Sequence, residues 1–470
     1  MGVRYTSFKV LILQMNQHSF ILKIYNIFIS FIVVGIFTFY GFTSSINYSK
    51  FTHSLIDSTD AYANDGFLRY DDYVYDASIQ TVLFYNLRNE LSYPLLPLNS
   101  DEKLKLSFDD LDTDLKTYYY TFIHCNVNWT PSDLIPSQYM TNYREDDVKE
   151  YKYSFNTDLN FIHYNITFPN EFINFKISGN YLIKVYDVNH PDQPIITKRF
   201  LVYENKTNIS ITPKNSVNAA ERFYQQEIDF TVDHSNYQIN NPFQNIHVIL
   251  MQNYRWDNAI SGLTPKFING SVLDYNYEGV NVFNGNNEYR NFDIKSMNFN
   301  SINVFRMQYS KEDQLMHIYL YDDEVRAYKK YYGQPDLNGN FLIKRDESTD
   351  PETDANYVKV HFNLTYDAPL QNGNLYLFGK FSDWKFNEAF KLQYDTLHKK
   401  YHQEILLKQG YYNYMYCFVK DGSKNTGDLS VVEGTYYETE NDYTVLVYYR
   451  NPMNANFDQL IGVQTVNSNQ

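Results

Sequence analysis

The sequence predicts an all-β protein built from tandem β-sandwich domains that follow an N-terminal signal peptide. Aromatic residues favour strands, and the chain of 470 residues contains 47 Tyr and 34 Phe. Short apolar stretches alternate with polar residues at a period of two and are separated by turn residues, without a helical period between them. Many short strands of this kind are typical of packed sheets, and the length predicts about three domains.

The first 45 residues differ from the rest of the chain. No charged residue occurs from Ile24 to Ser49, and three basic residues precede this apolar run. Basic residues, an apolar run and small residues up to Ser45 are the pattern of a secretory signal, which we expect to be cleaved near Ser45. The true start is Met1 or Met15, and the alternative to cleavage is an uncleaved membrane anchor. Residues 46–70 are polar and indicate a linker.

The first domain is predicted at residues 70–204, with its longest strand at Thr117–Trp129. Alternation places Cys125 and Trp129 on one face of this strand and His124 on the other. His124 and Cys125 therefore cannot form a nucleophile pair, and we expect a core strand with a buried thiol. The expected strands of this domain are Ile79–Tyr85, Lys103–Phe108, Thr117–Trp129, Asn160–Phe168, Asn180–Tyr186 and Ile195–Tyr203.

A Gly-x-Tyr motif opens two late strands, at Gly179 with Tyr181 and at Gly410 with Tyr412. A Tyr at this place resembles the tyrosine corner of immunoglobulin-like domains, in which the hydroxyl group bonds to backbone a few residues upstream. The motif therefore predicts immunoglobulin-like sandwiches at both ends of the chain.

A middle β-sandwich domain is predicted at residues 205–345. Its motif QNYRWDN sets Arg255 beside Trp256 and Asp257. Its expected strands are Gln225–Val232, Asn245–Gln252, Ser301–Tyr309, Met316–Tyr321 and Phe341–Lys344.

The second motif of the middle domain, NEYRNFD, sets Arg290 between Glu288 and Asp293. We interpret both Arg motifs as networks of Arg and carboxylates that anchor loops. The alternative is a glycosidase in which Glu288 and Asp293 form an acid–base pair, but nothing in the sequence marks one carboxyl as kept protonated.

The segment PDLNGNF has oxygen ligands at the spacing of a calcium loop, but Phe341 occupies the position that requires Gly. Asn338 and Gly339 instead predict a turn that leads into a strand at Phe341. No metal site, cofactor or catalytic residue is predicted, because the motifs of metalloproteases, nucleotide-binding loops and serine hydrolases do not occur. The formal charge of −15 disfavours nucleic acid and anionic lipid as partners.

The last domain is predicted at residues 346–453, followed by a flexible tail at 454–470. Its strands lie within Asn374–Trp384, within 406–422 and at Tyr443–Tyr449. The second cysteine, Cys417, lies in an apolar strand of this domain, and we expect it to be buried and not joined to Cys125.

An ordered set of motifs resembles the plug protein family of the type IX secretion system, found in the Bacteroidetes. The set is SFDDL, FIHCNVNW, NFIHYNITFPN, SGNYLIKVYD, RFLVYEN, QNYRWDN, NEYRNFD, PDLNGNF and LKQGYYNYMY, and the resemblance covers essentially all of residues 70–450. The resemblance implies a periplasmic, non-enzymatic protein that associates peripherally with the outer membrane and seals the large translocon barrel there. It implies no cofactor, no small-molecule substrate and no membrane span of its own. It does not indicate which surface of the protein binds the barrel.

The last domain is also similar to the glycogen-binding module attached to starch-active enzymes. In GKFSDW, from Gly379 to Trp384, the Trp matches one that stacks on sugar in that family. Met415 stands where a glycan-binding Lys is expected, and no Trp follows Gly422. Two of three sugar contacts are missing, so Trp384 is expected to be a packing residue. A glycan-binding protein of a polysaccharide-uptake system remains the alternative function.

Overall fold

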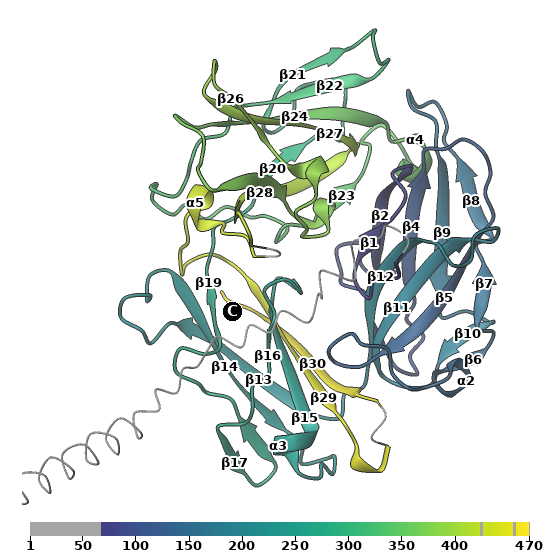
Figure 1. Cartoon of the computed structure of the whole chain (residues 1–470), viewed down its shortest axis with the longest axis vertical. Coiled ribbons are helices and arrows are strands. Elements are labelled where there is room, and N and C mark those ends of the chain that lie inside the picture. Colours follow the sequence, from purple (N-terminus) through teal and green to yellow (C-terminus); the bar gives the residue numbers. More distant parts are fainter. Residues whose placement is uncertain (1–66, 424–425, 455–456, 470) are drawn as a thin grey trace, which may run out of the picture. The chain divides into compact units, whose positions relative to one another are not determined.

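The computed structural model describes residues 67–423, 426–454 and 457–469, which form seven sheets (Figure 1). The predicted signal peptide and its cleavage point lie outside the described residues, as does the predicted linker up to residue 66. The prediction of an all-β protein made of tandem sandwiches is confirmed. Among the described residues, no helix is long and apolar enough to cross a membrane. The short helices are α2 (Pro136–Tyr139), α3 (Pro242–Asn245), α4 (Pro351–Asp354), α5 (Ser430–Glu433), η1 (Lys380–Ser382), η2 (Glu388–Phe390) and η3 (Pro452–Asn454).

The first sandwich packs a sheet of order β1-β12-β11-β5-β7, with β3 paired to β12, on a sheet of order β2-β4-β9-β8. Its core is aromatic, and the ring of Phe122 lies 4.6 Å from Phe168 and 5.6 Å from Phe200. A small sheet of β6 and β10 lies beside them. The strands are β1 (Tyr73–Val74), β2 (Ile79–Asn86), β3 (Leu95–Pro97), β4 (Leu104–Asp110), β5 (Tyr118–Cys125), β6 (Met140–Asn142), β7 (Glu145–Asp147), β8 (Glu150–Tyr153), β9 (Ile162–Phe168), β10 (Ile173–Phe175), β11 (Gly179–Asp187) and β12 (Pro194–Tyr203).

The second sandwich pairs strands that are far apart in the sequence. One sheet has the order β13-β14-β18-β17, with β19 paired to β14, and the other has the order β16-β15-β29-β30. Alternate residues of β15 and β29, among them Val248 and Val447, point into the core between the sheets. The strands are β13 (Asn208–Asn215), β14 (Gln225–Asp233), β15 (Ile246–Gln252), β16 (Ile260–Ser261), β17 (Phe267–Asn269), β18 (Val272–Asp274), β19 (Val282–Asn284), β29 (Asp442–Tyr449) and β30 (Gln459–Asn467).

The third sandwich packs a sheet of β20, β28, β23 and β25 on a sheet of order β21-β22-β24-β27-β26. Tyr412 of β28 lies between Phe292 and Phe341, each 5.2 Å away and nearly parallel to it. The strands are β20 (Arg290–Asp293), β21 (Val304–Tyr309), β22 (Met316–Leu320), β23 (Phe341–Ile343), β24 (Tyr357–Thr365), β25 (Gly373–Phe378), β26 (Gln393–Asp395), β27 (Lys400–Lys408) and β28 (Gly410–Lys420).

The sheets group the strands differently from the predicted domain boundaries at 345 and 453. Strands β20 to β23 belong to the third sandwich rather than to the middle one, and β29 returns to pair with β15 of the second sandwich (Figure 1). The predicted flexible tail is also wrong, because β30 pairs along the whole of β29 and buries Leu460 and Ile461 completely. Periodicity identifies strands but not their partners, and sequential strands are neighbours only as a tendency.

The predicted strand Thr117–Trp129 ends earlier than expected, at Cys125. The chain turns at residues 126–129, where the Trp129 N–H donates to the Asn126 carbonyl (2.9 Å) and Trp129 has a φ of 63°. The alternation within β5 holds, since Tyr118, Tyr120 and Phe122 face the first core. Cys125 and Trp129 lie in a separate cluster with Ile249, Leu446 and Leu460 of the second sandwich.

Candidate functional site

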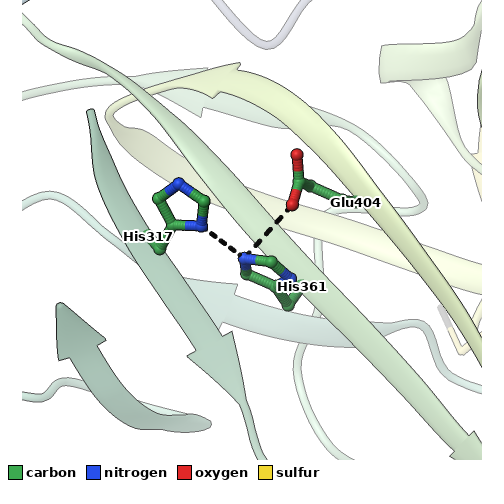
Figure 2. A group of neighbouring side chains, drawn as sticks. All are labelled: His317, His361 and Glu404. Carbon is green, nitrogen blue, oxygen red and sulfur yellow. Dashed lines mark hydrogen bonds and ion pairs between the residues drawn. The ribbon is translucent and has the colours of Figure 1, made fainter. Parts of the chain in front are cut away.

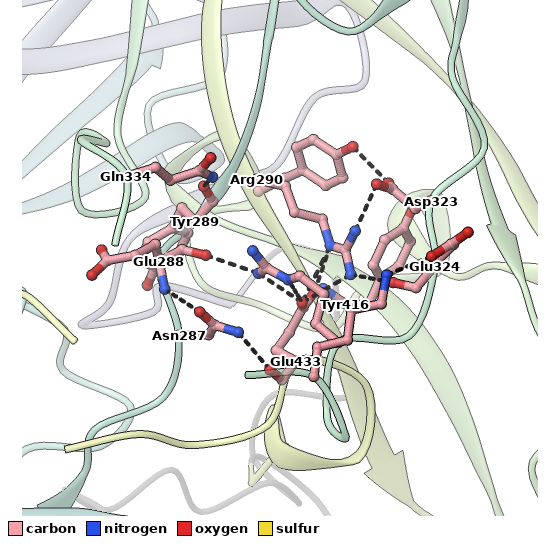
Figure 3. Close-up of polar contacts among 12 residues, drawn as sticks. Asn287, Glu288, Tyr289, Arg290, Asp323, Glu324, Gln334, Tyr416 and Glu433 are labelled. Carbon is pink, nitrogen blue, oxygen red and sulfur yellow. Dashed lines mark hydrogen bonds and ion pairs between the residues drawn. The ribbon is translucent and has the colours of Figure 1, made fainter. Parts of the chain in front are cut away.

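A buried charge network is centred on Arg290 of β20 (Figure 3). Its Nε donates to Glu433 Oε1 (3.0 Å), and its Nη1 donates to Asp323 Oδ1 (2.6 Å). Glu433 also accepts from Arg326 Nε (2.7 Å) and from the Tyr416 N–H (2.9 Å). Two guanidinium groups and two carboxylates therefore neutralise one another in the interior.

The protonation state of Glu433 follows from these contacts. Burial alone would raise its pKa, but Arg290 and Arg326 outweigh burial and hold the pKa below its usual value. A general acid needs a raised pKa near the working pH, so Glu433 is unsuited to donate a proton. A polar cavity of about 270 Å³ opens beside the network. Its lining residues are Asn287, Arg290, Asn291, Asn303, Asp323, Arg326, Lys329, Lys330, Tyr332, Gln334 and Tyr414.

The carboxylates expected beside Arg290 bind elsewhere. Glu288 accepts from the Tyr331 hydroxyl and from the Glu440 N–H (3.1 Å), and Asp293 pairs with Lys295 (3.2 Å). Residues three apart on a strand point to opposite faces, which explains why Arg290 does not meet Asp293. Arg290 thus stands in a network with carboxylates, but these are Glu433 and Asp323 rather than the expected Glu288 and Asp293.

The geometry does not support the alternative in which Glu288 and Asp293 act as the acid–base pair of a glycosidase. Burial raises the pKa of Glu288, and burial raises that of Asp336 to about 7. However, Glu288 and Asp293 are linked to different residues rather than to each other. The predicted pair of Glu288 with Asp293 is therefore not formed, and Glu288 lies beside Asp336 instead.

A second buried centre joins the first sandwich to the third. Asp109 of β4 accepts from Lys408 Nζ (2.7 Å), from the Tyr357 hydroxyl (2.6 Å) and from His163 Nδ1 (2.6 Å). The side chains of Asp109 and Lys408 are each 1% exposed. Burial alone would raise the pKa of Asp109, but Lys408 and His163 hold it below its usual value. Because a buried charge without a partner is costly, this contact ties the two sandwiches together.

Both Gly-x-Tyr motifs make the contact that the tyrosine-corner interpretation predicts. The Tyr181 hydroxyl donates to the Ile177 carbonyl (2.7 Å), and the Tyr412 hydroxyl donates to the Lys408 carbonyl (2.6 Å). Gly179 has a φ of 151°, and a Cβ there would collide with the His124 ring. A Cβ at Gly410 would collide with the carbonyl oxygen of Leu342 on the neighbouring strand β23.

The motif at Arg255 packs the second sandwich against the third. Arg255 binds Asp257 through Nε (3.1 Å) and Nη2 (2.6 Å), and its guanidinium carbon lies 5.2 Å from the ring centre of Trp384. Trp384 packs edge-on against Phe378, with ring centres 5.3 Å apart. Trp256 packs in the same manner on Trp129.

The surroundings of Trp384 bear on the glycan-binding alternative. Gly339 lies so close to the indole that a Cβ there would collide with it. Asn338 and Gly339 form the predicted turn, with positive φ at both residues, and β23 begins at Phe341 as expected. Gly379 is similarly close to the Asn413 carbonyl oxygen, 2.9 Å from the position of a Cβ. Trp384 is therefore a packing residue of this corner.

Cys125 and Cys417 are both buried and free, as predicted. Burial raises the pKa of the Cys125 thiol to about 12 and raises that of Cys417 well above its usual value. A thiol with a raised pKa is a poor nucleophile at neutral pH.

The residues of the Asp109 centre were missed at the level of sequence. The signal available was an ionisable residue inside a strand that is otherwise apolar, as at Asp109 in SFDDL and His163 in FIHYNITF. Glu433 and Asp323 lie in segments without a regular period, so only the fold brings them to Arg290.

Comparison with known proteins agrees with the resemblance found in the sequence. Residues 79–204 match the family model of the type 9 secretion system plug protein 1st domain. The chain is also similar to the crystal structure of a hypothetical protein from Parabacteroides merdae, with 33% identity and a TM-score of 0.81. The similarity covers 85% of this chain and 100% of that protein. No curated protein matches the chain. The chain therefore belongs to one family with the Parabacteroides merdae protein, and its residues 79–204 match the first domain of type 9 secretion system plug proteins.

Proposed function

We propose that this protein is the periplasmic plug of a type IX secretion system, which binds and seals the large outer-membrane translocon barrel when no cargo is exported. The observation that carries the proposal is the match of residues 79–204 to the plug protein first domain. The family match indicates a structural role, and no catalytic family is indicated.

The physical requirement is a large body without chemistry. A barrel of several dozen strands encloses a wide aqueous lumen, through which small molecules would cross an idle outer membrane. A stopper must keep its shape under contact with the barrel wall. The buried Asp109–Lys408 pair and the packing of Trp129 on Trp256 supply such cohesion between sandwiches.

A seal must also release. Reversible contact favours a polar surface with scattered aromatic residues, because Tyr adds contact area and stays compatible with water. Tyr328 and Tyr332 are 95% and 77% exposed and exemplify this surface. The partner is the translocon barrel, and the protein is peripheral to the outer membrane.

Capture from membranes tests the partner. The affinity-tagged protein should recover one very large β-barrel protein from solubilised outer membranes of its own host, whereas an unrelated tagged periplasmic protein should not. Failure to enrich the barrel under conditions that preserve the membrane complex would count against the proposal. The glycan alternative is tested separately by affinity electrophoresis in soluble starch, where retardation that Trp384→Ala abolishes would favour it.

A further inference from the structure

We infer that His317, His361 and Glu404 form a binding site for a divalent metal ion of the zinc type on the outer face of the third sandwich. The inference goes beyond the plug function and does not depend on it. Figure 2 shows the three side chains converging from the adjacent strands β22, β24 and β27. One donor atom from each residue lies within 4.8 Å of the other two.

The separations between the donor atoms suit a small ion after slight movement of the side chains. His317 Nδ1 lies 2.8 Å from His361 Nε2, which lies 3.5 Å from Glu404 Oε2. Bonds of about 2.0–2.2 Å in a tetrahedral zinc site place donor atoms roughly 3.3 Å apart. The two nitrogens hold one proton between them in a hydrogen bond, and a metal ion would replace that proton.

The neighbours of the two imidazoles fix their orientation. His317 Nε2 lies 3.0 Å from Asp313 Oδ2, so Nε2–H donates to this carboxylate and leaves the lone pair of Nδ1 facing His361. Tyr319 stacks on His361 with ring centres 4.2 Å apart. A carboxylate that holds the second nitrogen of a ligating His is the usual support of a metal site.

The ligands stand on hydrogen-bonded strands rather than on loops. His361 lies directly opposite Glu404 in the antiparallel pair of β24 and β27. The parallel pair of β22 and β24 sets Tyr319 opposite His361. His317 precedes Tyr319 by two residues, so its side chain lies on the same face of the sheet. The positions of all three ligands are therefore fixed by the sheet.

The charges around the group leave one carboxylate oxygen available. Lys359 Nζ lies 2.9 Å from Asp313 Oδ2 and 3.0 Å from Glu404 Oε1, which leaves Glu404 Oε2 for the metal. Glu404 is exposed, so water has access to the fourth coordination position. Two imidazoles and one carboxylate favour zinc over magnesium or calcium, which prefer oxygen ligands.

Titration of the full-length, untagged, chelator-treated protein with Zn²⁺ tests the inference. Calorimetry should find one saturable site per chain, and Co²⁺ should give the visible absorption of a tetrahedral site. Mg²⁺ should not compete. Bound Zn²⁺ should also raise the melting temperature, because an ion that binds only the folded chain stabilises it.

Variants separate this site from general binding to histidine. The double variant His317→Ala, His361→Ala should lose the site, and Asp313→Asn should weaken it about 10–100-fold while the Co²⁺ spectrum keeps its shape. His398→Asn is the matched control, since His398 also bonds a carboxylate, Asp395, at 2.6 Å but belongs to no group of three metal ligands among the described residues. Melting without metal should match the wild-type chain, which shows that the variants fold. Absence of a saturable site, or a site that the double variant retains, would overturn the inference.

Discussion

Asp109→Asn should destabilise the protein by about 3–5 kcal/mol, the cost typical of removing one partner from a buried ion pair. The substitution keeps the shape of the side chain but removes the charge that faces Lys408 Nζ at 2.7 Å. The Lys408 side chain is 1% exposed, so bulk solvent does not reach it to replace the lost carboxylate. Among the described residues, the other acceptor of Lys408 Nζ is the Glu352 carbonyl oxygen, also at 2.7 Å. The expected loss of unfolding free energy is therefore the cost of leaving the buried Lys408 ammonium group without a negative partner.

Urea unfolding at neutral pH, followed by fluorescence and circular dichroism together, measures the effect on the first transition. Lys152→Ala is the matched control, because Lys152 and Asp350 join the same two sandwiches at 3.1 Å with side chains 51% and 46% exposed. An exposed pair contributes about 1 kcal/mol or less. Adding Lys408→Met to Asp109→Asn should recover much of the loss, since the buried charge is then gone. If Asp109→Asn costs no more than Lys152→Ala, the ion pair does not join the sandwiches as argued.

Two further predictions concern single hydroxyl and carboxyl groups. Tyr181→Phe should cost about 1 kcal/mol through the lost bond to Ile177, whereas Tyr275→Phe should cost nothing, because the buried Tyr275 hydroxyl has no hydrogen-bond partner among the described residues. Equal melting temperatures for the two variants would show that the hydrogen bond of the Tyr181 hydroxyl does not stabilise the fold as a tyrosine corner. Burial would raise the pKa of Glu352, but Lys105 and His163 lower it from 4.5 to about 2. A depressed carboxyl pKa stabilises the folded chain above pH 4.5 and ceases to do so as pH falls toward 2, so Glu352→Gln should flatten the loss of melting temperature across that interval. An unchanged slope would contradict the assignment.

The strands themselves were largely predictable from local pattern. Alternation located β2, β4, β9, β11 and β12 within a few residues, because each buries at least one face in a single core. The turn at Asn338 and Gly339 was predictable for the same local reason, since two positive φ angles favour Asn and Gly.

The partners of these strands were not predictable. β15 pairs with β29 across nearly 200 residues, and no local property of either segment identifies the other as its partner. The same limit applies to the sites. Glu433 reaches Arg290, and Lys408 reaches Asp109, only after three sandwiches have formed. Sequence reasoning therefore found Arg290 but not its partner Glu433, and it missed both Asp109 and Lys408.

Outer-membrane permeability of a deletion strain tests the plug function most directly. A stopper contributes no energy and no chemistry to export, so deletion should leave cargo secretion intact while sensitivity rises to antibiotics too large for ordinary porins. Removal of the barrel as well should restore resistance, because the leak passes through its lumen. Normal permeability in the single deletion, together with loss of growth on starch, would contradict the plug function and favour glycan binding instead.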